Sequence, residues 1–357
     1  MHQPTSDLRI RATRSLPAPA TVEAEIPLSD AAASRISERR REIASIMAGQ
    51  DDRLLVIVGP CSIHDPAAAL EYAALLRTEA DRHAGEVLIA MRVYFEKPRT
   101  VVGWKGLIND PDLDETFQIS KGLRIARRLM VDIDAAGLPI GTEFLETTFG
   151  QYYADLVSWG SIGARTVESQ IHRELASGLS MPVGFKNRTD GNVQVAVDAI
   201  RSARHPHWFP TLAHDGTPAC MQTTGNLDTH LVLRGGTLGP NYSAEDVQSA
   251  AAILSKHGLP AFMMVEHEPC QQLEGRRRPP VVGRRGARRA NRRGRAHGVR
   301  GHGREQPGGR RPGLPFGPPR PRTQRHRRMP VLGKDRPPDR LACGGGRLAP
   351  KGGVLGP

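Results

Sequence analysis

The sequence is poor in cysteine and contains no long apolar run. Its four cysteines, Cys61, Cys220, Cys270 and Cys343, are too few and too scattered over 357 residues for a disulfide framework. The first fifteen residues lack the apolar stretch of a secretory signal. No run approaches the roughly 18 apolar residues of a membrane-spanning helix. These absences predict a protein of the reducing cytoplasm with no membrane segment.

Acidic residues are scarce in the last quarter of the chain. Residues 266–357 carry 24 Lys+Arg and only 6 Asp+Glu, a net charge of +18, whereas residues 1–265 carry 26 and 31, a net charge of −5. The same 92 residues contain 18 Gly and 14 Pro, a composition that cannot build a core. The overall charge of +13 therefore describes two unlike parts, a mildly acidic domain and a tail that we predict to be disordered.

The basic tail raises the alternative of a nucleic-acid-binding protein, because Lys and Arg neutralise phosphates. Phe316 is the only aromatic residue of the tail, however, so nucleic-acid bases would find almost no stacking partner. We therefore expect non-specific electrostatic binding at most, and no specific nucleic-acid partner.

Short apolar runs alternate with helical stretches along residues 51–265. Uninterrupted apolar runs are typical of strands buried on both faces of a parallel sheet. Such runs lie at 54–58, 87–93, 138–144, 161–165, 182–186, 230–234 and 261–265. Helices are predicted at 31–49, 67–83, 118–136, 151–159, 191–204 and 244–257. The pattern predicts an α/β fold, a (β/α)8 TIM barrel over 51–265. An N-terminal arm and helix (1–50) precede it, a hairpin interrupts it within 205–229, and the tail at 266–357 replaces its last strand and helix.

Polar residues follow almost every predicted strand. Barrel active sites lie at the carboxyl ends of the strands, so these side chains are expected to meet at one mouth. They are Cys61, Arg92, Lys97, Arg99, Glu143, Arg165, Lys186 and Arg234. Taken singly, each has a structural explanation, a surface ion pair for an arginine or simple burial for Cys61. Six cations gathered in an acidic domain instead favour a small anionic ligand with phosphate and carboxylate groups.

Several long motifs point to a specific family. They are GPCSIHDP (59–66), MRVYFEKPRTVVGWKGLINDP (91–111), SWGSIGARTVESQIHRELASG (158–178), PVGFKN (182–187), LRGG (233–236) and PNYS (240–243). Over residues 5–265 the sequence resembles type I 3-deoxy-D-arabino-heptulosonate-7-phosphate (DAHP) synthase. The resemblance implies an aldol-like condensation of phosphoenolpyruvate with erythrose 4-phosphate, which opens the shikimate pathway to aromatic amino acids. It also implies a divalent metal ion of the Mn, Fe, Co or Zn class.

The resemblance implies roles for the mouth residues. Phosphoenolpyruvate would be held by four cations, Arg92, Arg165, Lys186 and Arg234. Erythrose 4-phosphate would be held by Arg99 and Thr100. The catalytic residues would be Cys61 as a metal ligand, Lys97 as the proton-handling group between the substrates, and Glu143 beside the reacting carbons or their water. The family also implies homo-oligomers and feedback inhibition by an aromatic amino acid, through the N-terminal arm and the 205–229 insertion.

The resemblance stops after Val265. The family continues with motifs that supply His, Glu and Asp metal ligands, and none of these motifs follows in this sequence. The tail can be translated back into codons, chosen within the degeneracy of the genetic code, and read again from one nucleotide further on. In this second frame residues 268–275 become Ser-His-Ala-Asn-Ser-Ser-Lys and residues 300–306 become Gly-Ala-Met-Val-Glu-Ser-Asn. Residues 327–334 become Asp-Ala-Cys-Leu-Ser-Trp-Glu. Three family motifs in order and in one frame indicate a frameshifted C-terminus. With only Cys61 left of four ligands, and His267 in the wrong context, we expect no metal-dependent condensing activity.

One sibling enzyme is left as an alternative. 3-deoxy-octulosonate 8-phosphate synthase also joins phosphoenolpyruvate to a sugar phosphate. The Lys-Pro-Arg-Thr run at 97–100 and the long N-terminal arm favour DAHP synthase. A comparison of erythrose and arabinose phosphates as substrates would separate the two enzymes.

Overall fold

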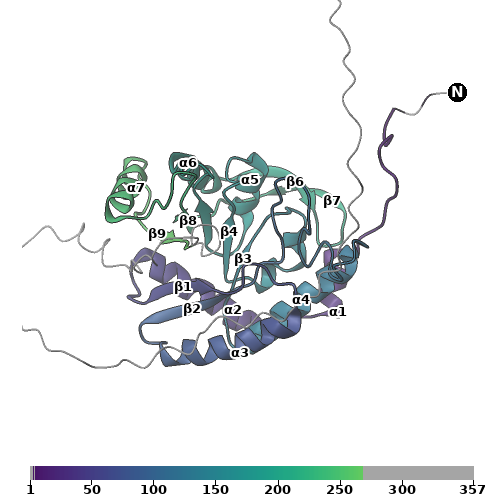
Figure 1. Cartoon of the computed structure of the whole chain (residues 1–357), viewed down its shortest axis with the longest axis horizontal. Coiled ribbons are helices and arrows are strands. Elements are labelled where there is room, and N and C mark those ends of the chain that lie inside the picture. The colour runs from purple at the N-terminus through teal and green to yellow at the C-terminus, as the bar shows by residue number, and fades with distance from the viewer. Residues whose placement is uncertain (1–2, 4, 268–357) are drawn as a thin grey trace, which may run out of the picture. The chain divides into compact units, whose positions relative to one another are not determined.

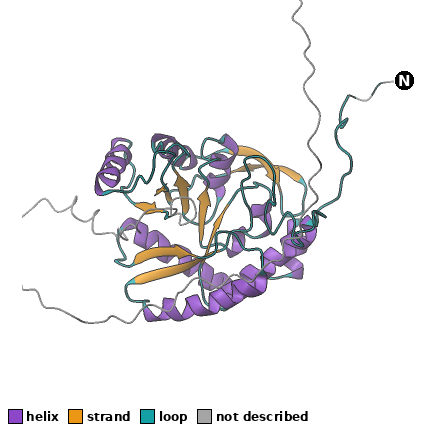
Figure 2. Cartoon of the chain, in the orientation of Figure 1, coloured by secondary structure: helices purple, strands orange, loops and turns teal. Residues whose placement is uncertain are grey.

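Within the described residues, a parallel sheet of seven strands forms the centre of the molecule (Figures 1 and 2). The computed structural model describes residue 3 and residues 5–267, all within Met1–Arg295, the first of two units into which the chain divides. The strands are β1 (Leu54–Val58), β2 (Val87–Arg92), β3 (Ile140–Glu143), β4 (Trp159–Ile162), β5 (Val183–Lys186), β8 (Thr229–Leu233) and β9 (Met263–Val265). Each pairs in parallel with the next in this order. Their carboxyl ends therefore lie along one rim.

The predicted strands all exist, and the α/β fold is confirmed. β1 has the predicted bounds, and β4 begins at Trp159, two residues before the predicted run. In the part of the chain that the structure describes, the sheet ends at β1 on one side and β9 on the other, and these two strands do not pair. The described sheet is therefore an open, barrel-like sheet. The tail predicted at 266–357 lies outside the described residues except for Glu266 and His267.

Helices follow the strands and cover the outside of the sheet (Figure 2). They are α1 (Pro19–Glu25), α2 (Asp30–Ala48), α3 (Pro66–Arg82), α4 (Ile119–Ala135), α5 (Gln170–Gly178), α6 (Gln194–Ala203) and α7 (Ala244–Lys256). Polar caps fix several of their starts. The side chains of Ser29, Asp65 and Ser169 accept hydrogen bonds from the first turns of α2, α3 and α5, and Ser243 forms a reciprocal capping box with Asp246 at α7. None of the described helices is long and apolar enough to cross a membrane.

Two helix predictions need correction. The stretch 151–159 is not an α-helix: it holds the short 3-10 helices η1 (Phe149–Tyr152) and η2 (Ala154–Leu156) before β4 begins. Phe149, Tyr152 and Leu156 are buried there, so tertiary packing decides the local geometry. Helix α5 was not among the predicted helices, and the N-terminal arm contains a short helix, α1, before the predicted one.

The predicted hairpin is present between α6 and β8. β6 (Trp208–Leu212) and β7 (Pro218–Gln222) pair in antiparallel fashion as a separate two-stranded sheet. Asp215 accepts hydrogen bonds from the backbone and hydroxyl groups of Thr217, and Gly216 takes a positive φ of 81°, which together make the turn. Pro210 and Pro218 are tolerated because both strands are edges.

One arginine ties the N-terminal arm to the rest of the fold. Arg127 on α4 is 1% exposed and donates to the carbonyls of Ile26 and Tyr152. It also forms a two-pronged ion pair with Asp155 at 2.7 and 2.8 Å. Its guanidinium thus satisfies acceptors from three chain segments at once.

Candidate active site

The strands β3 and β5 end in an ion pair. Lys186 closes β5 and its Nζ lies 2.6 Å from Oε2 of Glu143, the last residue of β3. Their side chains are 7% and 12% exposed. A buried ion pair is retained where each charge has a partner, so both side chains are held at the rim in a fixed geometry. The predicted meeting of Glu143 and Lys186 is observed.

A second carboxylate joins this pair from the end of β9. The Glu266 backbone N–H donates to the Leu233 carbonyl at 2.8 Å, which carries the ladder one residue past β9. Glu266 Oε1 then lies 3.1 Å from both Lys186 Nζ and Arg92 Nη1. Glu266 was predicted to begin the tail, but the structure makes it part of the rim.

The charges of this network stabilise one another. Burial alone would lower the pKa of Lys186, but the nearby Glu143, Tyr94 and Glu266 raise it above its usual value. Burial alone would raise the pKa of Glu266, but Lys186 and Arg92 lower it. Lys186 and Glu266 are therefore both charged at neutral pH. Among the described residues, Arg92 Nε and Glu266 Oε2 are buried without a hydrogen-bond partner.

A buried tyrosine lies against the two cations. The ring of Tyr94 has the Arg92 guanidinium carbon 4.0 Å from its centroid and Lys186 Nζ 5.3 Å away. Its hydroxyl and the Ser161 hydroxyl of β4 share a hydrogen bond of 3.0 Å. The sequence reasoning did not single out Tyr94, although it lies two residues after Arg92 in the 91–111 motif.

The loops after β2 and β4 bring further predicted cations to the rim. Lys97 Nζ donates to Cys61 Sγ at 3.0 Å, and Arg92 Nη2 donates to the Cys61 carbonyl at 3.4 Å. Arg165, which follows β4, reaches the Pro98 carbonyl at 3.3 Å. Cys61, Arg92, Lys97 and Arg165 are thus brought to one side of the rim.

Three other predicted residues, Arg99, Thr100 and Arg234, are less closely connected to the rim. Arg99 donates to the Trp104 carbonyl at 2.7 Å within its own loop, and Thr100 beside it is exposed. Arg234 follows β8 and lowers the pKa of Glu266 electrostatically, which puts its charge near the network.

Glu96 is a titratable group near the rim that the sequence reasoning missed. Its side chain is 9% exposed and its Oε2 accepts from the Glu146 backbone at 3.3 Å. Burial, with further contributions from Glu146 and Glu143, raises the pKa of Glu96 to about 8. Glu96 lies in the loop after β2, where the sequence gives no signal of such a shift, because the cause is the tertiary surroundings.

The described residues do not fit a resident divalent metal ion. Nowhere in the described part of the chain do three or more His, Cys, Asp or Glu side chains gather around a common point. Cys61 is exposed with Lys97 beside its sulfur. His267 packs edge-on against the Tyr242 ring at 4.9 Å. Cys270 and Cys343 lie outside the described residues.

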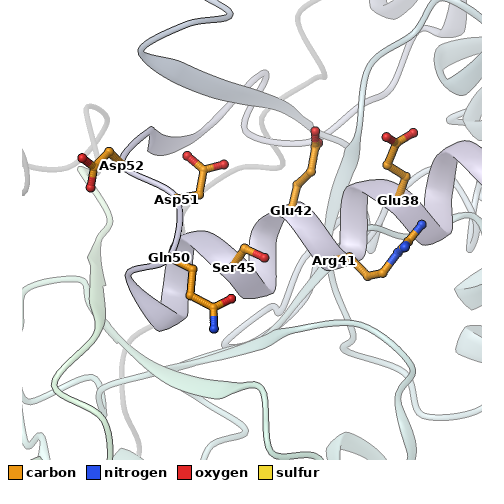
Figure 3. A pocket seen from close by; sticks show the side chains of 7 residues that line it. All are labelled: Glu38, Arg41, Glu42, Ser45, Gln50, Asp51 and Asp52. Atoms are coloured by element: carbon orange, nitrogen blue, oxygen red, sulfur yellow. The ribbon is translucent and has the colours of Figure 1, made fainter.

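A hollow of about 660 Å³ lies elsewhere, at the start of β1 (Figure 3). Its lining is Glu38, Arg41, Glu42, Ser45, Gln50, Asp51 and Asp52. Asp51 and Asp52 precede β1, so the hollow is at the amino end of that strand, whereas the cationic rim is at the carboxyl ends. A mostly acidic lining repels anionic ligands, and we do not assign the chemistry to it.

The comparisons with known proteins show the family of this chain. The model of the DAHP synthetase I family matches residues 25–299. The chain belongs to this family. A phospho-2-dehydro-3-deoxyheptonate aldolase of Corynebacterium glutamicum is 54% identical over 262 residues, 73% of this chain and 71% of the relative. The Phe-sensitive enzyme of Escherichia coli is 53% identical over 266 residues, 74% and 76% of the two chains.

A solved structure extends the likeness to three dimensions. The phospho-2-dehydro-3-deoxyheptonate aldolase of Francisella tularensis SCHU S4 superposes with a TM-score of 0.71 at 52% sequence identity, over 72% of this chain and 75% of that one. The predicted family and function are thereby confirmed: the sequence is that of a DAHP synthase, a carbon–carbon-bond-forming enzyme of aromatic biosynthesis. The family acts on phosphoenolpyruvate and erythrose 4-phosphate and uses a divalent metal ion.

Proposed function

We propose that the rim described above is the phosphoenolpyruvate site of this DAHP synthase. The observation that carries the proposal is the meeting of Arg92 and Lys186 on one carboxylate, Glu266 Oε1, at 3.1 Å each. A carboxylate or phosphate oxygen of a substrate has the same charge and would make the same two contacts. Arg165 and Arg234 supply the further positive charge that a substrate with both groups requires.

The second substrate is assigned to the loop after β2. Arg99 and Thr100 are exposed there, and Lys97 of the same loop donates to Cys61 Sγ. Erythrose 4-phosphate held by Arg99 and Thr100 would lie beside phosphoenolpyruvate held by Arg92. Two anions repel each other in water, so a cationic rim is needed to hold the reacting carbons in contact.

The proton-handling roles follow from this arrangement. In the condensation, C3 of phosphoenolpyruvate bonds to the aldehyde carbon, water adds at C2 and inorganic phosphate leaves. Lys97 can supply the proton that the former aldehyde oxygen takes up. Glu143 lies 2.6 Å from Lys186. It is the candidate group to contact the water that adds at C2.

The chain as it stands is proposed to lack condensing activity. Of the family's metal-ligand motifs the sequence keeps only the one with Cys61, and the described residues around Cys61 do not form a metal site. We attribute the loss to a frameshift near residue 266, since codons chosen within the degeneracy of the tail yield three family motifs in one alternative frame. We derive no reaction step through the metal ion, because the described donors do not fit one.

Two measurements test these proposals. Calorimetric titration should show that phosphoenolpyruvate binds the full chain, in which Arg92 and Lys186 are both present. The Lys186→Met variant should not bind it. Incubation with phosphoenolpyruvate, erythrose 4-phosphate and Mn²⁺ should yield no DAHP, whereas a frame-repaired chain should yield it and should discriminate against arabinose 5-phosphate. DAHP formation by the unrepaired chain, or a gene sequence without family motifs in the second frame, would refute the frameshift.

Regulation, assembly and location stay predictions. The Escherichia coli relative is a Phe-sensitive enzyme and the Enterobacter agglomerans relative is a Trp-sensitive enzyme, which supports feedback inhibition of this chain by an aromatic amino acid. A homo-oligomer and the reducing cytoplasm are expected from the family and from the cysteine content. We expect no specific nucleic-acid partner for the tail.

A further inference from the structure

We propose that Tyr94 is a positioning residue of the anion site. The face of its ring contacts Arg92 and Lys186 and holds these two cations close to each other. The inference rests on the proposed function, because it concerns the same two cations. Tyr94 would not touch the substrate. It would act through the cations that do.

The geometry places one ring beneath two charges from different strands. The Arg92 guanidinium carbon lies 4.0 Å from the Tyr94 ring centroid and Lys186 Nζ lies 5.3 Å from it. Both distances are within the roughly 6 Å over which an aromatic face attracts a cation. Arg92 ends β2 and Lys186 ends β5, and β3 and β4 separate these strands in the sheet. One ring thus contacts cations from two strands that are not neighbours in the sheet.

Bringing two cations together needs compensation, because like charges repel. In the structure Glu266 neutralises both from one side at 3.1 Å. The negative face of the Tyr94 ring attracts both cations as well. When an anionic ligand takes the place of the Glu266 contact, the ring remains as the fixed support of the pair.

The ring itself is held in place. Tyr94 is 5% exposed, and its hydroxyl shares a hydrogen bond of 3.0 Å with Ser161 on β4. Ser161 is fully buried and also reaches the Thr142 carbonyl of β3 at 3.4 Å. The hydroxyl therefore fixes the ring, and the ring face positions the cations. These two functions can be separated by mutation.

The experiment titrates inorganic phosphate and phosphoenolpyruvate, each alone, into the full chain by isothermal calorimetry. Tyr94→Leu keeps an apolar side chain and removes the ring, and it should weaken both ligands roughly five- to thirty-fold. Tyr94→Phe keeps the ring and removes the hydroxyl, and it should retain affinity within about twofold while its melting temperature falls by a few degrees. Tyr72→Leu, on α3 and away from the rim, is the matched control that should lose stability and keep affinity.

The outcomes separate this inference from the proposed function. If affinity follows melting temperature through all three variants, or if Tyr94→Leu binds as the wild type does, the ring has no positioning role. If the wild type binds phosphate but not phosphoenolpyruvate, the proposed substrate is wrong. A loss of phosphate affinity in Tyr94→Leu alone among the variants would still support the positioning role of the ring. If the wild type binds neither ligand, the rim is no anion site and both proposals fall.

Discussion

Oε1 of Glu266 lies 3.1 Å from Nζ of Lys186, at the place where the family resemblance puts an anion of the substrate. The contact joins the residue after β9 to the last residue of β5. The carboxylate is covalently attached to the site, so it is present at a high effective concentration. Under the proposed function, a free anion must displace the Glu266 carboxylate before it can bind Lys186 and Arg92.

Glu266→Gln is therefore expected to strengthen anion binding. The amide keeps the size of the side chain but gives up its negative charge, so phosphate or phosphoenolpyruvate should bind about 5–10-fold more tightly, roughly 1 kcal/mol. Calorimetric titration of both variants measures the change. Glu245→Gln, an exposed position in the first turn of α7, is the control and should bind as the wild type does. Equal affinities for all three proteins would show that Glu266 does not compete.

Arg127→Met is expected to destabilise the fold. The substitution keeps a long apolar side chain but leaves the carbonyls of Ile26 and Tyr152 and the carboxylate of Asp155 without their donor. We expect a loss of about 3 kcal/mol in the free energy of unfolding, measured by urea titration. Arg128→Met, the exposed neighbour on the same helix, should cost less than about 0.5 kcal/mol. Similar losses in the two variants would contradict the anchoring role of Arg127.

His230 should make the fold sensitive to acid. Trp159 Nε1 donates to its Nε2 at 3.1 Å, and burial lowers the pKa of His230 from 6.5 to about 4. The unfolded chain therefore takes up this proton first, so the stabilising effect is complete above pH 6.5 and is lost as the pH falls toward 4. The expected loss from pH 7 to pH 5 is about 2 kcal/mol. This loss in the free energy of unfolding, measured by urea titration at the two pH values, should disappear in His230→Gln. It should persist in His205→Gln, because His205 is exposed.

Glu96 should make the fold sensitive to base. Its raised pKa, about 8, means that the folded state holds the carboxyl neutral. The neutral carboxyl of Glu96 contributes fully to the free energy of unfolding below pH 4.5, and this contribution is lost as the pH rises through 8. The expected loss is about 3 kcal/mol between pH 5.5 and pH 8.5. Urea unfolding at the two pH values measures this loss. It should be absent in Glu96→Gln and unchanged in Glu86→Gln, an exposed control; a wild type whose stability is level across this range would rule out the shift.

The strands and the rim cations could be predicted from the sequence, because both depend on local composition. The run 54–58 is apolar throughout and becomes β1 with the same bounds. Lys186 and Arg92 follow directly from their place at strand ends. The hairpin within 205–229 was also recognisable from its position between two barrel-like units.

The remaining features depend on contacts between distant residues. Phe149 and Tyr152 are spaced as in a helix, but their burial forces short 3-10 turns at 149–156. Tyr94 looks like an ordinary strand residue until β5 brings Lys186 over its ring. Glu266 belongs to the rim only because β9 pairs with β8. No window of local sequence contains these relationships.

The order of strands in the sheet has a consequence for synthesis. Apart from the separate hairpin, each strand pairs with the strand made just before it, from β1 through β9. A growing chain can therefore add each strand to a partner that has already left the ribosome. A change in the message near codon 266 alters only what is made afterwards. The cations of the proposed substrate site, from Arg92 to Arg234, all precede that codon, so the proposed frameshift would leave them in place and change only the residues that follow.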